Sequence, residues 1–118
     1  RCGWFDAVAV RYAHMLNGFT RLALTNLDVL DSFSELKICV GYELDGQRIP
    51  SIPDAHRQEH VTPIYETLPG WEADTTNARS FADLPPNAQR YVRRIEELVG
   101  APINIISVGP ERNQTFLI

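Results

Sequence analysis

The segment from Pro85 to Gly100 constrains the fold of this chain more than any other part of the sequence. Pro85 and Pro86 open it where a first helical turn does not need their N–H groups, and Asp83 is the expected N-cap. Gly100 closes the segment, and Pro102 prevents its continuation. Between these signals one apolar stripe recurs at helical spacing: Ala88, Tyr91, Val92, Ile95, Leu98 and Val99. A helix with one apolar stripe needs a sheet or another helix to cover it, so the sequence predicts a layered fold.

Short apolar runs elsewhere in the chain predict β-strands. The run from Arg21 to Thr25 is short and apolar and is expected to be a strand buried on both faces. A second helix is expected from Trp4 to Leu16, with Asp6 in its first turn and Asn17-Gly18 as its stop. The remaining expectations are strands at 36–44, 47–49, 64–68, 103–107 and 115–118, a tight turn at Asp45-Gly46 and a proline-rich surface excursion at 51–62.

Helices that alternate with short strands place the chain in the α/β class. We expect a mixed, mostly parallel sheet with flanking helices and a β-hairpin. The length of 118 residues suits a single domain spanning 1–118. The sequence starts with Arg1 instead of Met, within a few residues of a helical pattern, and it stops inside an expected strand. We therefore expect a domain piece truncated at both ends.

The composition narrows the class of protein. Hydrophobic residues make up 44% of the chain and charged residues 22%, as in an ordinary soluble globular protein. The net charge of −4 disfavours binding to nucleic acid through its phosphates. No apolar stretch is long enough to span a bilayer, and no secretory signal pattern opens the chain. We expect a cytoplasmic protein with neither nucleic acid nor membrane as a partner.

Cysteine and histidine residues give no sign of a metal site. Cys2 and Cys39 stand far apart without a C-x-x-C pattern, so reduced thiols are expected, with Cys39 acting as a small buried apolar side chain. His14, His56 and His60 lack carboxylate or cysteine neighbours at zinc-like spacing. We therefore assign no metal ligand.

The loop from Thr25 to Asp31, directly after Leu22-Ala23-Leu24, carries the clearest candidate for chemistry. A carboxylate on a loop that leaves a buried strand can accept two adjacent hydrogen bonds from the N1–H and N2–H₂ edge of guanine. Adenine lacks that pair of donors and would leave the carboxylate unpaired. Asp is also common in turns and caps, so spacing alone favours a structural role for Asp28. For Asp31 a loop or capping role is the favoured interpretation.

A series of motifs gives this loop a context. In their order and spacing they resemble the C-terminal portion of adenylosuccinate synthetases, a family that uses GTP to join L-aspartate to IMP. The motifs run through nearly the whole chain: Cys2–Asp6, Leu24–Asp31, Cys39–Tyr42, Pro63–Trp71, Arg94–Leu98 and Pro102–Pro110. The resemblance implies part of a larger, P-loop-NTPase-like α/β enzyme, a carbon–nitrogen ligase of purine (AMP) biosynthesis.

The resemblance also assigns site residues. Two strand-end loops are expected to enclose the guanine base of GTP, with Pro110 packing nearby: Asn26, Leu27 and Asp28 on one, Ser107, Val108 and Gly109 on the other. Asp28 matches the residue that binds the guanine edge, and Gly109 would let backbone N–H groups approach guanine O6. The family normally has lysine at the position of Asn26. The asparagine side chain is expected to hold the loop by hydrogen bonds to neighbouring backbone.

Other parts of the enzyme are not expected in this chain. The family's glycine-rich phosphate loop, its catalytic Asp and His and its Mg²⁺ ligands have no match here, so no catalytic residue is assigned and the isolated chain is expected to be inactive. The resemblance implies GTP, IMP and L-aspartate as substrates, Mg²⁺ as cofactor, the rest of the same polypeptide as partner, and a homodimer. Arg1 is assigned no ligand.

Two other interpretations remain open at this stage. The chain could be a non-catalytic α/β scaffold without nucleotide binding, in which Asn26 marks a structural loop. It could also self-associate through unpaired strand edges. Trp4 and Trp71 are expected to pack in the core or at its edge. Basic side chains on the 86–99 helix are expected to form a solvated face paired with Glu96 and Glu97: Arg90, Arg93 and Arg94.

Overall fold

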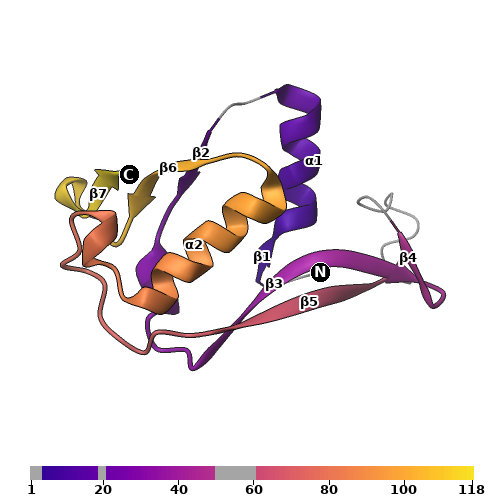
Figure 1. Cartoon of the computed structure of the whole chain (residues 1–118), viewed down its shortest axis with the longest axis horizontal. Coiled ribbons are helices and arrows are strands. Elements are labelled where there is room, and N and C mark those ends of the chain that lie inside the picture. The colour runs from indigo at the N-terminus through magenta and orange to yellow at the C-terminus, as the bar shows by residue number, and fades with distance from the viewer. Residues whose placement is uncertain (1–3, 19–20, 50–60) are drawn as a thin grey trace.

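The computed structural model describes residues 4–18, 21–49 and 61–118 and contains two small sheets joined by a helix (Figure 1). The elements follow one another as β1 (Phe5–Asp6), α1 (Ala7–Asn17), β2 (Leu22–Leu24), η1 (Leu27–Leu30), β3 (Glu35–Leu44), β4 (Gln47–Ile49), β5 (Val61–Pro69), η3 (Phe81–Asp83), α2 (Pro86–Val99), β6 (Ile103–Ser107), η4 (Arg112–Gln114) and β7 (Thr115–Leu117). The elements labelled η are short 3-10 turns.

The larger sheet is built around β3. Strand β5 pairs antiparallel with it from Glu35 to Leu44, while β1 and β4 share its other edge. Strand β1 is parallel to β3 and β4 is antiparallel, which forms the expected hairpin. The turn at Asp45 and Gly46 places both residues at positive φ, 53° and 81°, as a two-residue hairpin turn requires.

The smaller sheet has the order β2-β6-β7 and lies at the left of Figure 1. Strand β2 is parallel to β6, and β7 returns antiparallel. Within the described residues β2 has β6 as its one partner, so it is an edge strand, and Ala23 is exposed. The expectation that this strand is buried on both faces is therefore wrong.

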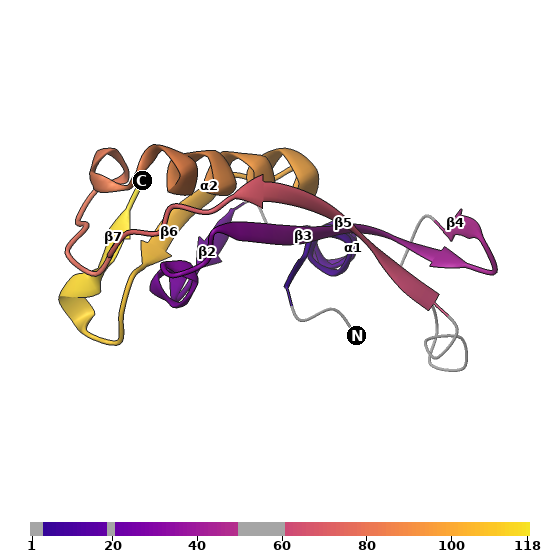
Figure 2. The same cartoon turned by 90° about the horizontal axis from the view of Figure 1, so that it is seen from below.

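Helix α2 lies along one side of both sheets (Figure 2). Its fully buried Val92 and Ile95 belong to one core cluster that also contains Ile38 of the larger sheet and Ile106 of the smaller one. Arg94 adds a two-bond ion pair with Glu66 of β5, at 2.6 and 2.7 Å. These contacts make α2 the element that joins the two sheets.

The ends of the helices differ in part from expectation. Helix α1 begins at Ala7 rather than Trp4, because Phe5 and Asp6 pair with β3 as a strand. Asp6 is the N-cap and accepts a bond from the Ala9 N–H at 3.0 Å. Its other carboxylate oxygen accepts a bond from the Tyr42 hydroxyl.

Helix α2 is also capped differently from expectation. It follows Pro85, and Asp83 is not its N-cap because that residue ends the preceding turn η3. The expected stops are confirmed, since Gly18 and Gly100 both adopt the left-handed conformation.

The strand expected at 64–68 is longer than predicted. It begins at Val61 and contains Pro63, which lies opposite Tyr42 of β3. A proline is tolerated there because β5 pairs on one side only among the described residues, so no second ladder needs its missing N–H. The rest of the expected surface excursion, residues 51–60, lies outside the described residues, as do His56, His60 and Cys2.

The mixed α/β class is confirmed, with two helices and a hairpin. Its "mostly parallel" detail is wrong, because β1–β3 and β2–β6 are parallel whereas β3–β4, β3–β5 and β6–β7 are antiparallel. Cys39 is fully buried, as expected. Among the described helices none has the length and apolarity that crossing a membrane would need.

Candidate functional site

The two loops singled out in the sequence lie side by side. Turn η1 follows β2, and the segment from Val108 to Glu111 follows β6. Because β2 and β6 are parallel neighbours, their carboxyl ends lie side by side, and both loops begin at the same end of these strands. The N–H of Asn26 donates a hydrogen bond of 2.8 Å to the Oγ of buried Ser107. Strand pairing and this bond therefore bring together residues 81 positions apart.

The backbone of Asn26 holds the first loop. It lies in the left-handed region, at φ 56° and ψ 44°, which asparagine adopts more readily than most residues. Its carbonyl accepts a bond from the Val29 N–H at 3.2 Å and opens the turn. Its side chain makes no capping bond to η1, so the expected side-chain role at this turn is not seen.

Asp28 presents an unsatisfied carboxylate. Leu27 beside it is 1% exposed and anchors the turn in the core. Asp28 itself is partly exposed, but its Oδ1 atom is covered and finds no hydrogen-bond partner among the described residues. A buried carboxylate oxygen without a donor is energetically unfavourable. Local capping of the turn therefore does not explain the position of this oxygen atom.

The second loop is packed around the side chain of Gln114. Val108 is fully buried and its N–H donates to the Gln114 carbonyl oxygen at 2.8 Å. A Cβ placed on Gly109 would stand 2.2 Å from the Gln114 Oε1 atom. The glycine therefore makes room for an amide side chain within the protein, a role that the sequence did not indicate.

The long-range partners of Asp31 were not predicted from the sequence. Its Oδ1 accepts bonds from Trp71 Nε1 at 2.7 Å and from the Thr75 hydroxyl at 2.8 Å. Its Oδ2 accepts a bond from the Thr75 N–H at 2.7 Å. The expected local loop or capping role is therefore incomplete, because these partners lie 40 and 44 positions away in the sequence. No local pattern in one sequence could have revealed them.

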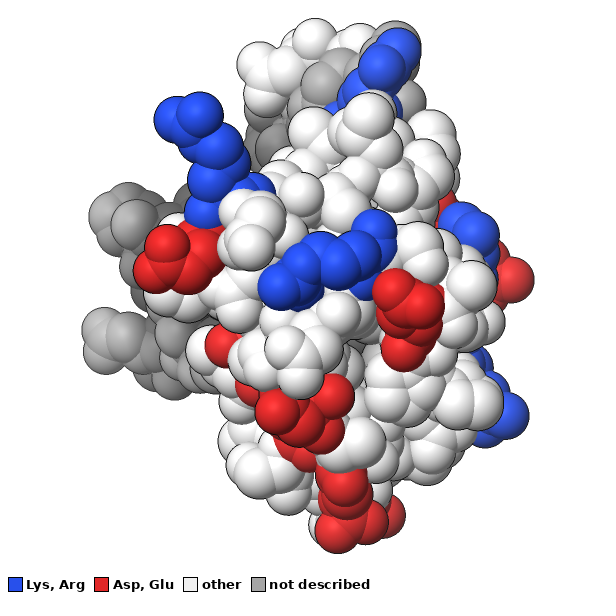
Figure 3. Space-filling model, turned by 90° about the vertical axis from the view of Figure 1, so that its left-hand side faces the viewer, with Lys and Arg blue, Asp and Glu red and all other residues white. Residues whose placement is uncertain are grey.

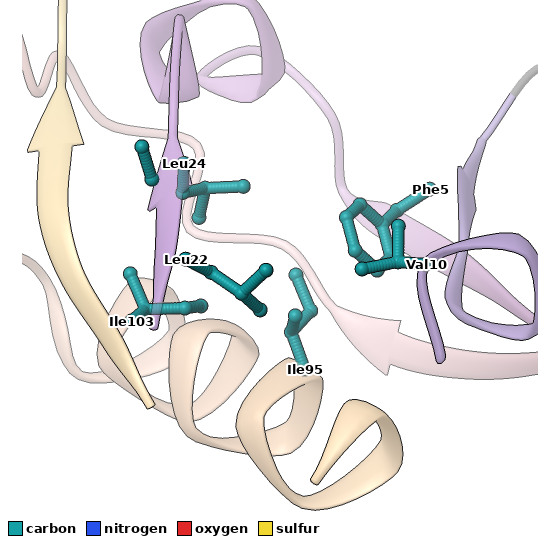
Figure 4. A pocket seen from close by; sticks show the side chains of 7 residues that line it. Phe5, Val10, Leu22, Leu24, Ile95 and Ile103 are labelled. Atoms are coloured by element: carbon teal, nitrogen blue, oxygen red, sulfur yellow. The ribbon is translucent and has the colours of Figure 1, made fainter. Parts of the chain in front are cut away.

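Two hollows near this region are lined mainly by apolar groups. One, of about 280 Å³, is lined by Thr25, Asn26 and Leu27 and by the aromatic residues Trp4, Phe5 and Tyr91. Its lining does not include Asp28, Ser107 or Gly109. The other, of about 100 Å³, is lined by Phe5, Val10, Ile95 and residues of β2 and β6, whose labelled side chains are all hydrocarbon (Figure 4). Neither offers the polar edge that would orient a base.

Charges near the site are mixed. On the left-hand side of the molecule acidic side chains gather in the lower part of the view, and basic ones are scattered above and beside them (Figure 3). Two of the three basic side chains expected to pair on α2 do so, Arg93 with Glu96 at 2.8 Å and Arg94 with Glu97 at 3.1 Å. Within the described residues no group of three or more His, Cys, Asp or Glu side chains is placed to hold a metal ion.

The comparisons with known proteins agree on one family. A sequence model described as "Adenylosuccinate synthetase" matches residues 1–116. The chain belongs to this family. It is 52% identical over 119 residues to the adenylosuccinate synthetase of Trichlorobacter lovleyi and 57% identical over 115 residues to that of Thermomicrobium roseum. A solved structure titled "Structure of fully ligated Adenylosuccinate synthetase from Plasmodium falciparum" matches with a TM-score of 0.94 at 32% identity.

These matches cover the adenylosuccinate synthetase relatives in part. The alignments take in 100% and 97% of this chain but 28% and 27% of the two relatives, and the structural match takes in 29% of the Plasmodium falciparum chain. The chain thus spans little more than a quarter of their length. Family membership, in a ligase family of purine biosynthesis, confirms the resemblance seen in the sequence.

Proposed function

We propose that this chain is the C-terminal, guanine-base-binding portion of an adenylosuccinate synthetase, which uses GTP to join L-aspartate to IMP. The observation that carries the proposal is the unpaired Oδ1 of Asp28, on a loop bonded directly to the Ser107 loop. The residues proposed to contact the base are those predicted from the sequence: Asn26, Leu27, Asp28, Ser107, Val108 and Gly109.

The chemistry of the carboxylate supports guanine as the ligand. A guanine edge offers two parallel N–H donors to one carboxylate, and charge-assisted bonds of this kind are among the stronger ones in proteins. Because Oδ1 is covered in the free protein, the side chain must rotate to use both oxygens, and it has no local bond to Oδ1 to break. Adenine would leave the carboxylate as it is, unpaired. Discrimination therefore comes from the partner that only guanine supplies.

The rest of the GTP molecule is proposed to contact other parts of the enzyme. The family resemblance assigns the metal and the groups that act on the γ-phosphate to the remainder of the polypeptide. This chain holds and orients the base at one end of the nucleotide. By itself it is proposed to be inactive, and the whole enzyme to be a cytoplasmic homodimer.

The first test is nucleotide binding by this chain. Amide NMR spectra of ¹⁵N-labelled protein are recorded during titration with GDP and, separately, with ADP. We expect GDP alone to shift amides of Leu27, Asp28, Val108 and Gly109, and Asp28→Asn to abolish that preference, since an amide replaces one acceptor with a donor. Asp45→Asn is the matched control, because it makes the same change in an exposed hairpin turn.

Equal responses to GDP and ADP would contradict the guanine assignment. Dispersed spectra unmoved by either nucleotide would favour the alternative of a scaffold without nucleotide binding. Light scattering on the same samples checks self-association through open strand edges, which a monodisperse monomer would exclude.

A further inference from the structure

A short segment connects the two loops of the proposed base site. It runs from Trp71 to Thr76, between β5 and η3, and we call it the strap. In Figures 1 and 2 it passes beside η1 and then beside the connection between β6 and β7. Its first contact is with Asp31, at the end of η1, through Trp71 and Thr75. The strap is therefore fastened to the loop that carries Asp28.

The other end of the strap reaches the second loop. The carbonyl oxygen of Thr76 accepts a bond from Gln114 Nε2 at 3.3 Å. The Oε1 atom of the same amide accepts the Glu111 N–H at 3.0 Å, directly over Gly109. One glutamine side chain thus links the strap to the loop that follows β6.

The strap has the packing of a fixed spacer. Thr75 is 2% exposed and Trp71 is 8% exposed, with its ring against Tyr91 of α2 at 5.8 Å. Asp74 folds back and accepts bonds from the Thr76 N–H at 2.8 Å and hydroxyl at 2.6 Å. The strap is therefore held by Asp31 of the first loop, by the Tyr91 ring of α2 and by Gln114 next to the second loop.

Asp31 is suited to its position for a chemical reason. Three donors point at its two oxygens, and a carboxylate is acceptor-only on both. Asparagine has one acceptor oxygen, so its NH₂ group would face at least one N–H or O–H donor. The position therefore calls for a charged acceptor, although it does not face the proposed ligand.

We infer that the strap fixes the spacing of the two base-binding loops, with Asp31 and Gln114 as its positioning residues, and so sets the affinity for guanine nucleotides. This inference rests on the proposed function. No strap residue is among those proposed to contact the base, so the strap is expected to govern how tightly GDP binds and to leave the preference for GDP over ADP to Asp28. Neither positioning residue is a catalytic residue.

The test cuts each end of the strap separately. Thr75→Val removes the hydroxyl bond to Asp31 and keeps the N–H bond, and Gln114→Glu keeps an acceptor for Glu111 but removes the donor to Thr76. Thr62→Val, on an exposed position of β5, is the matched control. Each cut is expected to raise the dissociation constant for GDP about two- to tenfold, with the preference over ADP unchanged. The double variant is expected to lose less affinity for GDP than the product of the two single effects, because either substitution alone already releases the spacing of the two loops.

A second readout needs no nucleotide. Hydrogen exchange is followed at amides whose bonds close the two loops, those of Val29 and Asp31 in one and Val108 and Gln114 in the other. Each cut is expected to speed exchange in both loops, and Thr62→Val in neither.

The outcomes separate this inference from the proposed function. Unchanged GDP affinity in both single variants, strictly multiplicative effects in the double variant, or faster exchange confined to the loop adjoining each cut would overturn the strap's role. Absence of any GDP response in the unmodified chain would overturn the proposed function, while the exchange measurement still decides whether the strap couples the loops. Loss of the GDP preference itself in Thr75→Val would also count against the inference, because selectivity would then depend on the strap.

Discussion

The two sheets of this molecule are stabilised in different ways. In the larger sheet β3 and β5 pair along nearly their whole length, so the backbone ladder itself fixes the arrangement. In the smaller sheet β2 and β7 have three residues each, and the loops beyond them are held by side-chain bonds to Ser107, Asp31 and Gln114. The proposed base site lies on the second sheet, where individual side chains set the geometry.

Because of this difference, we expect different residues to determine the stability of the fold and the geometry of the proposed site. A backbone ladder tolerates many side chains, provided that one face stays apolar. A loop held by a few side-chain bonds tolerates few changes at those residues but can be tuned by them. Substitutions in the larger sheet should therefore change the stability of the whole chain, whereas those around the smaller sheet should also change the loops.

The largest effect is expected from Ile38→Ala in β3. Ile38 is fully buried in the core cluster, and the change leaves a cavity. We expect the free energy of unfolding to fall by about 2–5 kcal/mol, measured by urea denaturation. Val29→Ala, at a side chain that is 65% exposed, is the control and should change it by less than about 0.5 kcal/mol. A small effect at Ile38 would contradict the expectation that substitutions in the larger sheet change the stability of the whole chain.

A smaller loss is expected from Asp31→Asn. The amide cannot satisfy the donors of Trp71 and Thr75 together, and we expect a cost of about 1–3 kcal/mol by urea denaturation. Asp45→Asn, in the exposed turn of the larger sheet, should be nearly neutral. If the two variants were equally stable, the claim that side chains hold the smaller sheet's loops would be wrong.

Gly109→Ala is expected to lower the free energy of unfolding by about 1 kcal/mol. The new methyl group displaces the Gln114 amide and costs its bonds to Glu111 and Thr76. Hydrogen exchange at the Val108 amide should become faster in this variant. Unchanged stability and exchange would show that Gln114 can bond elsewhere.

The smallest effect is expected at the ion pair between Glu66 and Arg94. The hydrogen bonds from the Arg94 guanidinium hold the pKa of Glu66 below its ordinary value of 4.5, while burial acts in the opposite direction. Because the pKa is lower in the folded state, the pair stabilises the fold above pH 4.5 and that contribution is lost as the pH falls through the folded-state pKa. Both side chains are about one-third exposed, so Glu66→Gln should cost less than about 1 kcal/mol at pH 7.

The pH profile provides the check for this ion pair. The free energy of unfolding of the unmodified chain and of Glu66→Gln is measured by urea denaturation at pH 7 and pH 3. The difference between the two proteins should be smaller at pH 3 than at pH 7. A difference that grows in acid would contradict the assignment.

The sequence predicted most of the elements because their signals are local. Prolines and Gly100 bound α2, and Asp45-Gly46 sets the hairpin. The predictions were wrong where a distant segment determines the local structure. Phe5 is a strand residue because β3 lies beside it. Pro63 is part of β5 because this strand lies at the edge of the sheet. Contiguous motifs predicted the family and the two loops. The partners of Asp31, the role of Gln114 and the strap were not predicted, because they depend on contacts between distant parts of the chain. The assignment of guanine contacts stays a prediction.

The left-handed backbone at Asn26 has a consequence for how this position can vary. The codons of asparagine and lysine differ only in their third base, so one mutation interconverts the residue found here and the lysine usual in the family. Lysine in the left-handed region costs roughly 1 kcal/mol more than asparagine does. Lysine also brings an aliphatic stem that can lie along a flat base. Under the proposed function, a single base change would therefore exchange loop stability for contact with the nucleotide base.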